Sequence, residues 1–373
     1  MTRNSPSIRD MNTFGNGSKV AVIGAGISGS ALAQALMGEG AAVHVFDKSC
    51  GPGGRMATRR CAWTDDERNS RITAFDHGAP CFSAKDAAFR AAVAQAVHAG
   101  CVTTWQPRLH PQSLPCPDAE QGSAHFVAAP DMPQWCRHLV RGAIPRWEQA
   151  VQGLRRTPRG WAVESSDLLW ADVFDAVVLA LPPAQAAPLL APHQREWAQR
   201  ASLAVMQPCW TLMGISDATA DIGSWDMARP EPGALGMVLR NESRPGREAR
   251  RGEVHWVLHA KAGWSRAHID QEPAWIASAM QQALAEWLGA PLRWQHAVAH
   301  RWRYAMPQVG RHPVTPSGWW DERLRLGVCG DFLGGGGVEG AWRSAQSVAQ
   351  AMQGTAEPAA VEEIALAKEE LGL

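Results

Sequence analysis

The stretch that decides the fold is KVAVIGAGISGSALAQALMGEGAAVHVFD, residues 19–47. It begins with a short apolar run, Lys19 to Ile23, which is typical of a buried strand. Three glycines follow in the spacing GxGxxG, and Ile27 to Met37 then carries a helical pattern. A second apolar run, Val43 to Phe46, predicts the next strand. This order predicts a βαβ unit with a glycine turn after its first strand.

Each glycine of this turn has its own task in a Rossmann-type dinucleotide-binding unit. Gly24 allows the tight turn, Gly26 lets the backbone approach a pyrophosphate, and Gly29 lets helix and strand pack closely. The first helical residues, Ile27 and Ser28, present free amides to the phosphates. These residues predict a dinucleotide site, although the fingerprint alone does not separate FAD from NAD.

The end of the second strand, Asp47 and Lys48, adds an acid about 20 residues after the glycines, where it can bind ribose hydroxyls. Its charge disfavours NADP, whose 2′-phosphate it would repel. A second glycine loop follows, formed by Gly53, Gly54, Arg55 and Met56. Such a loop can wrap a pyrophosphate from the other side with amides and a guanidinium, which favours FAD.

A third glycine block lies near the end of the chain. Asp331 ends a strand, where it can accept hydrogen bonds from the ribitol side of a flavin, and a helix begins near Val338, Glu339 and Ala341. Its positive end would stabilise the charge that reduction places on an isoalloxazine. Glu339 is equally well explained as an acid that matches the helix dipole. We also expect the backbone of Val151 to contact the adenine.

The rest of the chain predicts a second unit. Strand-like runs at Trp210–Ile215, Met237–Arg240, His255–Ala260 and His296–Ala305 enclose one helical stretch, Pro273–Leu288. The predicted fold class is therefore α/β, with a Rossmann-like FAD-binding domain and a substrate domain on a mixed, largely antiparallel sheet. The expected bounds are 18–90, 140–185 and 322–353 for the first domain, 91–139 and 186–321 for the second, and 1–17 and 354–373 for the tails.

Composition limits the partners of the protein. The 373 residues include 36 basic and 36 acidic side chains, so no net charge favours nucleic acid or a membrane surface. Apolar runs are too short to span a bilayer, and the first 18 residues lack a signal-peptide pattern, so we expect a soluble, cytoplasmic protein. The eight cysteines show no CxxC spacing, which argues against a metal site. The charged, glycine-containing run Arg244 to Gly252 predicts a surface loop.

The three cofactor blocks, in this order, resemble the amine-oxidase and p-hydroxybenzoate-hydroxylase superfamily, and within it the bacterial renalase family. The similar segments are FDKSCGPGGRMATRR (46–60), FDHGAPCFSAKD (75–86), VVLALPPAQAAPLL (177–190), WVLHAKAGWSR (256–266), AHRWRYA (299–305) and CGDFLGGGGVEGAWRSAQ (329–346). The resemblance implies non-covalent FAD and oxidation of the 2- and 6-dihydro isomers of NAD(P)H, with O2 as acceptor and H2O2 as product. The chain departs from its relatives at Cys50, Pro80, Cys81 and Gly337.

A dihydronicotinamide needs no catalytic base, because its ring nitrogen drives hydride departure, so positioning carries most of the acceleration. The resemblance places His259, Asn241 and Arg240 in the substrate wall, and Trp302 and Tyr304 follow in the AHRWRYA run. An amine oxidase is the main alternative, although this chain has one tyrosine and five lysines, of which Lys261 alone lies in the middle strands. A redox-sensing flavoprotein without catalysis and a hydroxylase are further alternatives.

Overall fold

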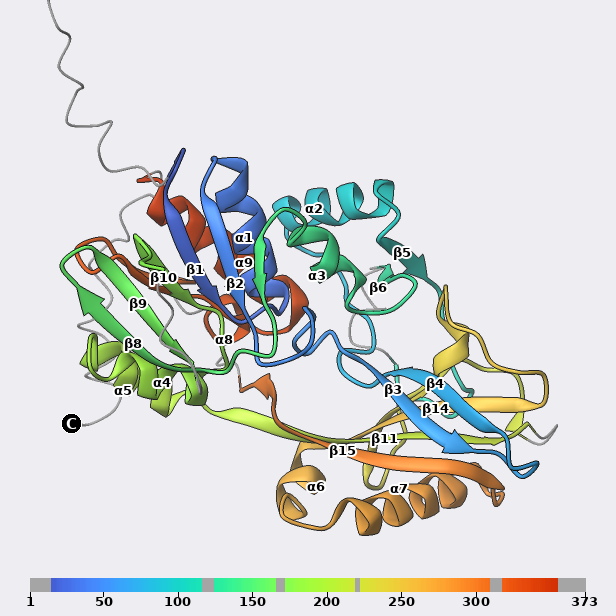
Figure 1. Ribbon diagram of the computed structural model, residues 1–373. Helices are drawn as coiled ribbons and strands as arrows, with labels where there is room; N and C mark the ends of the chain where they lie inside the picture. The colour runs from blue at the N-terminus through green and yellow to red at the C-terminus, as the bar shows by residue number, and fades with distance from the viewer. Residues whose placement is uncertain (1–14, 116–123, 166–171, 219–221, 309–316, 355–373) are drawn as a thin grey trace, which may run out of the picture.

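The protein is built from two units that meet along the middle of the molecule (Figure 1). The computed structural model describes residues 15–115, 124–165, 172–218, 222–308 and 317–354. No helix among them is both long and apolar enough to cross a membrane. They also hold no group of three or more His, Cys, Asp or Glu side chains arranged for a metal ion.

The first unit contains a six-stranded sheet whose strands come from distant parts of the chain. Its neighbouring strands run parallel, except that β16 is antiparallel to β17. In spatial order the strands are β16 (Trp319–Asp321), β17 (Leu326–Val328), β10 (Ala176–Leu179), β1 (Lys19–Ile23), β2 (Ala42–Phe46) and β7 (Ile144–Arg146).

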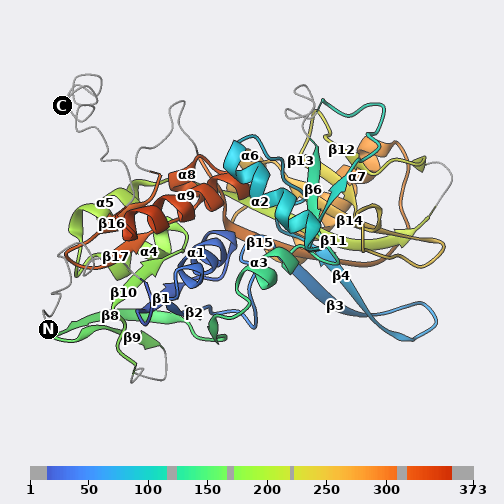
Figure 2. The ribbon, with the colours of Figure 1, turned by 90° about the horizontal axis from the view of Figure 1, so that it is seen from above.

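Both faces of this sheet are buried, which explains its continuous apolar strands. In β1, Val20 and Val22 belong to one core with the helices α1 and α9, whereas Ala21 and Ile23 belong to a second core with α4 and α5. Helices α1 and α9 lie side by side (Figure 2). The helices of this unit are α1 (Ile27–Gly38), α2 (Ala87–His98), α3 (Gln134–Leu139), α4 (Pro183–Leu190), α5 (Arg195–Leu203), α8 (Asp331–Gly334) and α9 (Gly337–Met352).

The second unit is a five-stranded sheet with antiparallel neighbours throughout. One face packs on α7 (Pro273–Leu288), which begins with proline and ends at left-handed Gly289, a cap that stops a helix. The short helices α6 (Ala262–Ala267) and η4 (Asn241–Ser243) join its strands. In spatial order these are β12 (Met227–Ala228), β13 (Leu235–Arg240), β14 (Glu253–Ala260), β11 (Met206–Asp217) and β15 (Trp294–Pro307).

Three two-stranded ribbons complete the described part of the chain, and one of them lies across the second sheet on the side away from α7 (Figure 1). That ribbon is formed by β3 (Thr58–Thr64) and β4 (Ser70–Asp76), which the sequence patterns did not predict. The others are β5 (Val102–Trp105) with β6 (His125–Ala128), and β8 (Val151–Thr157) with β9 (Gly160–Ser165).

The structure confirms the predicted fold class, a Rossmann-like α/β unit with a second sheet. The domain bounds stay a prediction. Residues 91–139 were placed in the second domain, yet α3 within them packs with α1 of the first unit.

Candidate active site

The first glycine turn is shaped by close backbone contacts. Gly24 has a φ of +106°, and a Cβ there would lie 2.5 Å from the Ala180 carbonyl oxygen. A Cβ on Gly29 would lie 1.9 Å from the Gly24 carbonyl oxygen, so only glycine lets α1 pack this closely on the turn. Helix α1 begins at Ile27 without a side-chain cap, which leaves its first amides available to phosphate oxygens.

The second glycine loop lies directly on the first. The Gly53 amide donates to the Ala25 carbonyl at 2.9 Å, and Gly53 forms a bridge with Gly26. A Cβ on Gly54 would lie 2.9 Å from the Gly26 Cα. Met56 is 2 % exposed and anchors the loop in the core. The two loops therefore form one backbone cradle, with close approaches that side chains would block.

Asp47 fixes the edge of this cradle. Its carboxylate accepts hydrogen bonds from the Ala25 and Ser49 amides, both at 2.8 Å. Two oxygens still offer further lone pairs to ribose hydroxyls. The neighbouring Lys48 is exposed, and Gln149 donates its amide to the Asp47 carbonyl at 2.9 Å. That bond brings the start of β8, and with it half-buried Val151, close to Asp47.

Arg55 connects the cradle to the third block. Its guanidinium donates to both oxygens of Asp331 at 2.6 Å and to the Ala305 carbonyl at 3.1 Å. The Asp331 side chain is 5 % exposed, so this forked pair is largely shielded from water. One guanidinium thus joins the glycine loop, the start of α8 and the end of β15.

The helix α9 begins at Gly337 without a side-chain cap, so its first amides are available to an anionic edge. A Cβ on Gly334 would lie 1.8 Å from the Gly340 carbonyl oxygen, which shows how tightly α8 is folded onto α9. Val338 and Ala341 are buried in the core. Ser28, at the start of α1, is also buried.

Glu339 is engaged in a structural role. Its carboxylate accepts hydrogen bonds from the Lys85 amide at 2.6 Å and the Asp86 amide at 3.2 Å. Asp86 in turn caps α2 by accepting from the Phe89 amide at 2.9 Å. The carboxylate of Glu339 therefore holds the start of α2 onto α9.

The face of the second sheet opposite α7 carries a row of polar and aromatic side chains. In register across β14, β11 and β15 lie His259, Thr211 and His300, which therefore share this face. His77, one residue after β4, lies over the row. Its ring centroid is 4.8 Å from that of His300 and 4.9 Å from that of Trp302, and Trp302 Nε1 donates to the His77 carbonyl at 3.0 Å. We call His77, His259, His300 and Trp302 the imidazole cluster.

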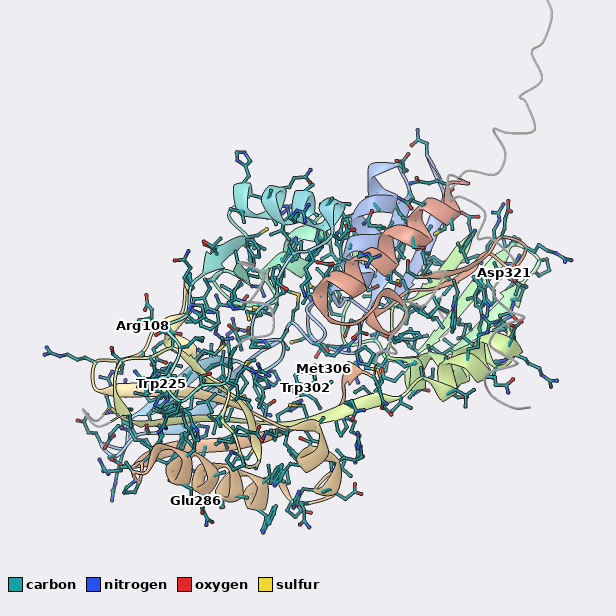
Figure 3. The ribbon with its side chains drawn as sticks, turned by 180° about the vertical axis from the view of Figure 1, so that it is seen from behind. Arg108, Trp225, Glu286, Trp302, Met306 and Asp321 are labelled. Atoms are coloured by element: carbon teal, nitrogen blue, oxygen red, sulfur yellow. The ribbon has the colours of Figure 1, made fainter. Side chains whose placement is uncertain are left out.

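The imidazole cluster is uncharged near neutral pH. Burial, helped by His300 and Arg59, lowers the pKa of His77 to about 3. Burial with Arg244 lowers the pKa of His259 to about 4, and burial with Arg59 lowers the pKa of His300 to about 4. Among the described residues, no carboxylate or lysine forms a hydrogen bond or ion pair with the cluster. Trp302 lies in the middle of the molecule, where the two units meet (Figure 3).

His259 presents one unpaired ring nitrogen. Its Nδ1 lies 3.2 Å from the Thr211 hydroxyl oxygen, whereas its buried Nε2 has no hydrogen-bond partner among the described residues. If Thr211 donates to Nδ1, Nε2 carries the proton and can donate to a ligand. Tyr304 lies two residues after Trp302 and beside Ala305, the residue whose carbonyl accepts from Arg55. The end of β15, which carries Trp302 and Tyr304, is thus joined to Arg55 of the cofactor cradle through the Ala305 carbonyl.

Two residues predicted for the substrate wall are placed elsewhere. Arg240 is in register with Trp256, on the face of the sheet opposite His259, and its guanidinium carbon lies 4.8 Å from the ring centroid of Trp225. Trp225 is at the far end of the second unit from Trp302 (Figure 3). Arg240 therefore lies outside the imidazole cluster.

Asn241 is 1 % exposed and serves the backbone. Its Oδ1 accepts from the Asp76 amide at 3.1 Å and from Arg244 at 2.5 Å, and its Nδ2 donates to the Ala74 carbonyl at 3.1 Å. With these partners Asn241 holds β4 against η4. These bonds hold the strand end that precedes His77, and none of them joins Asn241 to the cluster.

The predicted surface loop Arg244 to Gly252 is wrong at its start. The Arg244 side chain is fully buried, and that of Arg247 is 5 % exposed. Both face Asp76, and Arg247 Nε donates to its carboxylate at 2.7 Å. Burial alone would raise the pKa of Asp76, but the two guanidiniums outweigh it and hold that pKa below its usual value. This ion-paired group fixes the strand end that carries His77.

The residues that the sequence patterns missed are His77, His300 and Thr211. His77 lies in the FDHG run and His300 in the AHRW run, both quoted above for their resemblance, but neither run indicates which ring faces which. The register of three strands brings Thr211 and His300 beside His259, and the end of β4 brings His77 onto His300. Lys261, the lysine weighed for an amine oxidase, pairs at 2.6 Å with Glu231.

Comparison with known proteins supports this architecture. A family model described as an NAD(P)-binding Rossmann-like domain matches residues 22–96. The chain is similar to a putative protoporphyrinogen oxidase from Exiguobacterium sp. 255-15, with a TM-score of 0.67 and 11% identity over 91% of this chain and 99% of that chain.

Two further solved structures are similar. One is an oxidoreductase from Methanosarcina mazei, with a TM-score of 0.63 and 14% identity over 88% of this chain and 99% of that chain. The other is cyclohexylamine oxidase from Brevibacterium oxydans IH-35A, with a TM-score of 0.62 and 13% identity over 91% of this chain and 99% of that chain. At these identities the likeness establishes the fold alone.

Proposed function

We propose that this protein is an FAD-dependent oxidase of renalase type that oxidises the 2- and 6-dihydro isomers of NAD(P)H. The observation that carries the proposal is the neutral imidazole cluster between the two units, with the buried Nε2 of His259 unpaired. Such a site suits an uncharged, flat ring with a carbonyl group. The fold, which it shares with solved oxidases, supports an oxidoreductase.

The residues of the three blocks fit FAD. The paired glycine loops form a cradle in which a Cβ would collide with backbone, and the uncapped starts of α1 and α9 offer amides to anionic groups. We propose that the cofactor is held without a covalent bond, since Cys329 is fully buried in the core. The proposed binding residues are Gly24, Gly26, Ile27, Ser28, Gly29, Asp47, Lys48, Gly53, Gly54, Arg55, Met56, Val151, Asp331, Val338, Ala341 and, through its backbone amide in the first turn of α9, Glu339.

The chemistry that FAD supplies when bound is acceptance of a hydride at N5 and transfer of the electrons to O2, which gives NAD(P)⁺ and H2O2. The protein's own residues bind and orient the substrate. Trp302 and His300 offer ring faces for stacking, and His259 Nε2 can donate to a carboxamide oxygen. We propose that Tyr304, which precedes Ala305 in the chain, also contacts the substrate. Because the imidazoles stay neutral, they neither need nor supply a proton during hydride loss.

An amine oxidase is the second candidate, favoured by the likeness to cyclohexylamine oxidase. The cluster would have to bind an amine in its neutral form, because it contacts no described carboxylate that could pair with an ammonium group. Lys261 is also paired with Glu231, away from the cluster. These contacts make the amine reading the weaker one.

The test is oxygen consumption by the purified holoenzyme with 2- and 6-dihydro-NAD(P), ordinary NADH, cyclohexylamine and putrescine. Acid precipitation first shows whether FAD is released into the supernatant. Rapid oxygen uptake with a dihydro isomer and H2O2 formation would support the proposal, whereas uptake with amines alone would refute it.

A matched pair of variants tests the cluster. Trp302→Leu removes a ring that packs against His77 and His300, and we expect kcat/KM to fall at least about tenfold while FAD stays bound. Trp275→Leu changes an exposed tryptophan on α7, on the other face of the sheet, and should leave kcat/KM unchanged. Equal effects of the two substitutions would contradict the placement of the substrate at the imidazole cluster.

A further inference from the structure

The ribbon of β3 and β4 lies over the face of the second sheet that carries the imidazole cluster (Figure 1). Alternate residues of β3 point at that sheet: Cys61 and Trp63 are buried, and the ring centroid of Trp63 stacks 6.0 Å from that of His296. Phe75, in register with Arg59, lies 5.9 Å from the His255 ring centroid. Arg59 shares the side of β3 that carries Cys61 and Trp63, and therefore also faces the sheet.

Strand geometry brings Arg59 toward His300. Arg59 lies four residues before Trp63, so both side chains are on the same face of β3. His300 lies four residues after His296, so these two side chains also share a face of β15. Strands β3 and β15 run in opposite senses (Figure 1), so the contact of Trp63 with His296 places Arg59 beside His300. In agreement, the charge of Arg59 helps to lower the pKa of His77, His296 and His300.

Arg59 is a cation without a partner among the described residues. Neighbouring arginines are paired: Arg60 lies 3.9 Å from Asp131, and Arg71 lies 2.6 Å from Asp65. No described carboxylate lies within 4.0 Å of the Arg59 guanidinium. Arg59 is exposed, so it stands at the rim of a neutral cluster with all of its donors available.

We propose that Arg59 binds a phosphate group of the substrate, so that the enzyme selects dihydronicotinamide nucleotides over the phosphate-free ring or riboside. This inference rests on the proposed function and deepens it. The neutral cluster binds the uncharged dihydronicotinamide ring. The Arg59 guanidinium pairs with the phosphate on the 5′ carbon of the ribose that carries this ring. The same charge repels ammonium groups, which works against amine substrates.

Ligand binding to the oxidised holoenzyme tests the proposal, with the visible flavin spectrum or calorimetry as the readout. The probes are nicotinamide mononucleotide, nicotinamide riboside and inorganic pyrophosphate. Mononucleotide and riboside share the same cationic ring and differ only in the phosphate. Arg59→Gln should therefore raise the Kd of the mononucleotide and of pyrophosphate about tenfold and should not raise that of the riboside. Arg59→Lys should restore part of the affinity. Arg60→Gln, one residue along β3 on its other side, is the matched control and should change none of these values.

The outcomes separate this inference from the proposed function. Equal losses for mononucleotide and riboside in Arg59→Gln would show a structural role and overturn the phosphate site, as would wild-type affinities that do not depend on the phosphate. If pyrophosphate binding depends on Arg59 but no dihydronicotinamide reduces the flavin, the anion site is supported and the proposed function is refuted. If the dihydro isomers reduce the flavin but Arg59→Gln changes none of the Kd values, the proposed function stands and the phosphate site is refuted.

Discussion

The same substitution at two glycines of α1 should change the free energy of unfolding in opposite directions. Replacing glycine by alanine inside a helix favours folding by about 1 kcal/mol through helix propensity. Gly38 is the last residue of α1, and a Cβ there would meet no atom within 4 Å, so Gly38→Ala should gain stability by at most that amount. At Gly29 the Cβ would lie 1.9 Å from the Gly24 carbonyl oxygen and 3.0 Å from the Ala180 Cβ.

Because the obstacle at Gly29 is backbone, the turn or the helix must shift. Overpacking of this kind costs about 1–3 kcal/mol or more, which outweighs the propensity gain. The Gly24 peptide would move with it, so Gly29→Ala should also lower the FAD content of the purified protein. Urea unfolding of both apoproteins and the flavin absorbance of both holoproteins measure these effects. A Gly29→Ala protein as stable as Gly38→Ala, with full FAD content, would refute the close packing of turn and helix.

Three other predictions concern charged groups. Asp331→Asn breaks the forked pair with Arg55 and should lower the free energy of unfolding by about 2 kcal/mol and weaken FAD binding; unchanged urea midpoints and FAD affinity would contradict this. His77 has a folded-state pKa of about 3 against about 6.5 when unfolded, so its contribution to stability is complete above pH 6.5 and is lost as pH falls toward 3. Between pH 7 and pH 5 the wild type should therefore lose about 2 kcal/mol more than His77→Gln in urea unfolding, and equal losses would show that His77 titrates normally. Glu339→Gln can accept only one of the amide hydrogen bonds from residues 85–86 and should cost about 1 kcal/mol of stability without slowing flavin reduction, whereas slow reduction at full stability would indicate a catalytic role.

The cofactor cradle could be predicted from the sequence because its determinants are local. The glycine positions follow from turn geometry and helix packing within one βαβ unit, and the structure places the loops of Gly26 and Gly54 against each other. Helix α7 was predicted at its observed bounds because a proline and a glycine mark its ends.

The substrate wall could not be predicted, because it depends on which face of each strand meets the other unit. Arg240 and His259 belong to neighbouring strands, but the register of Arg240 with Trp256 sends their side chains to opposite faces. Likewise, Arg244 and Arg247 were placed in a surface loop because their burial depends on Asp76, which is 168 residues earlier than Arg244. His77 meets His300 only through the fold.

The renalase-type reaction is the central claim, and anaerobic stopped-flow spectroscopy of the holoenzyme tests it most directly. The flavin absorption band is followed after mixing, separately, with 2- and 6-dihydronicotinamide dinucleotides, ordinary NADH and amines. The neutral imidazole cluster predicts fast bleaching by at least one dihydro isomer and none by amines. Bleaching by amines alone would contradict the claim and make the protein an amine oxidase.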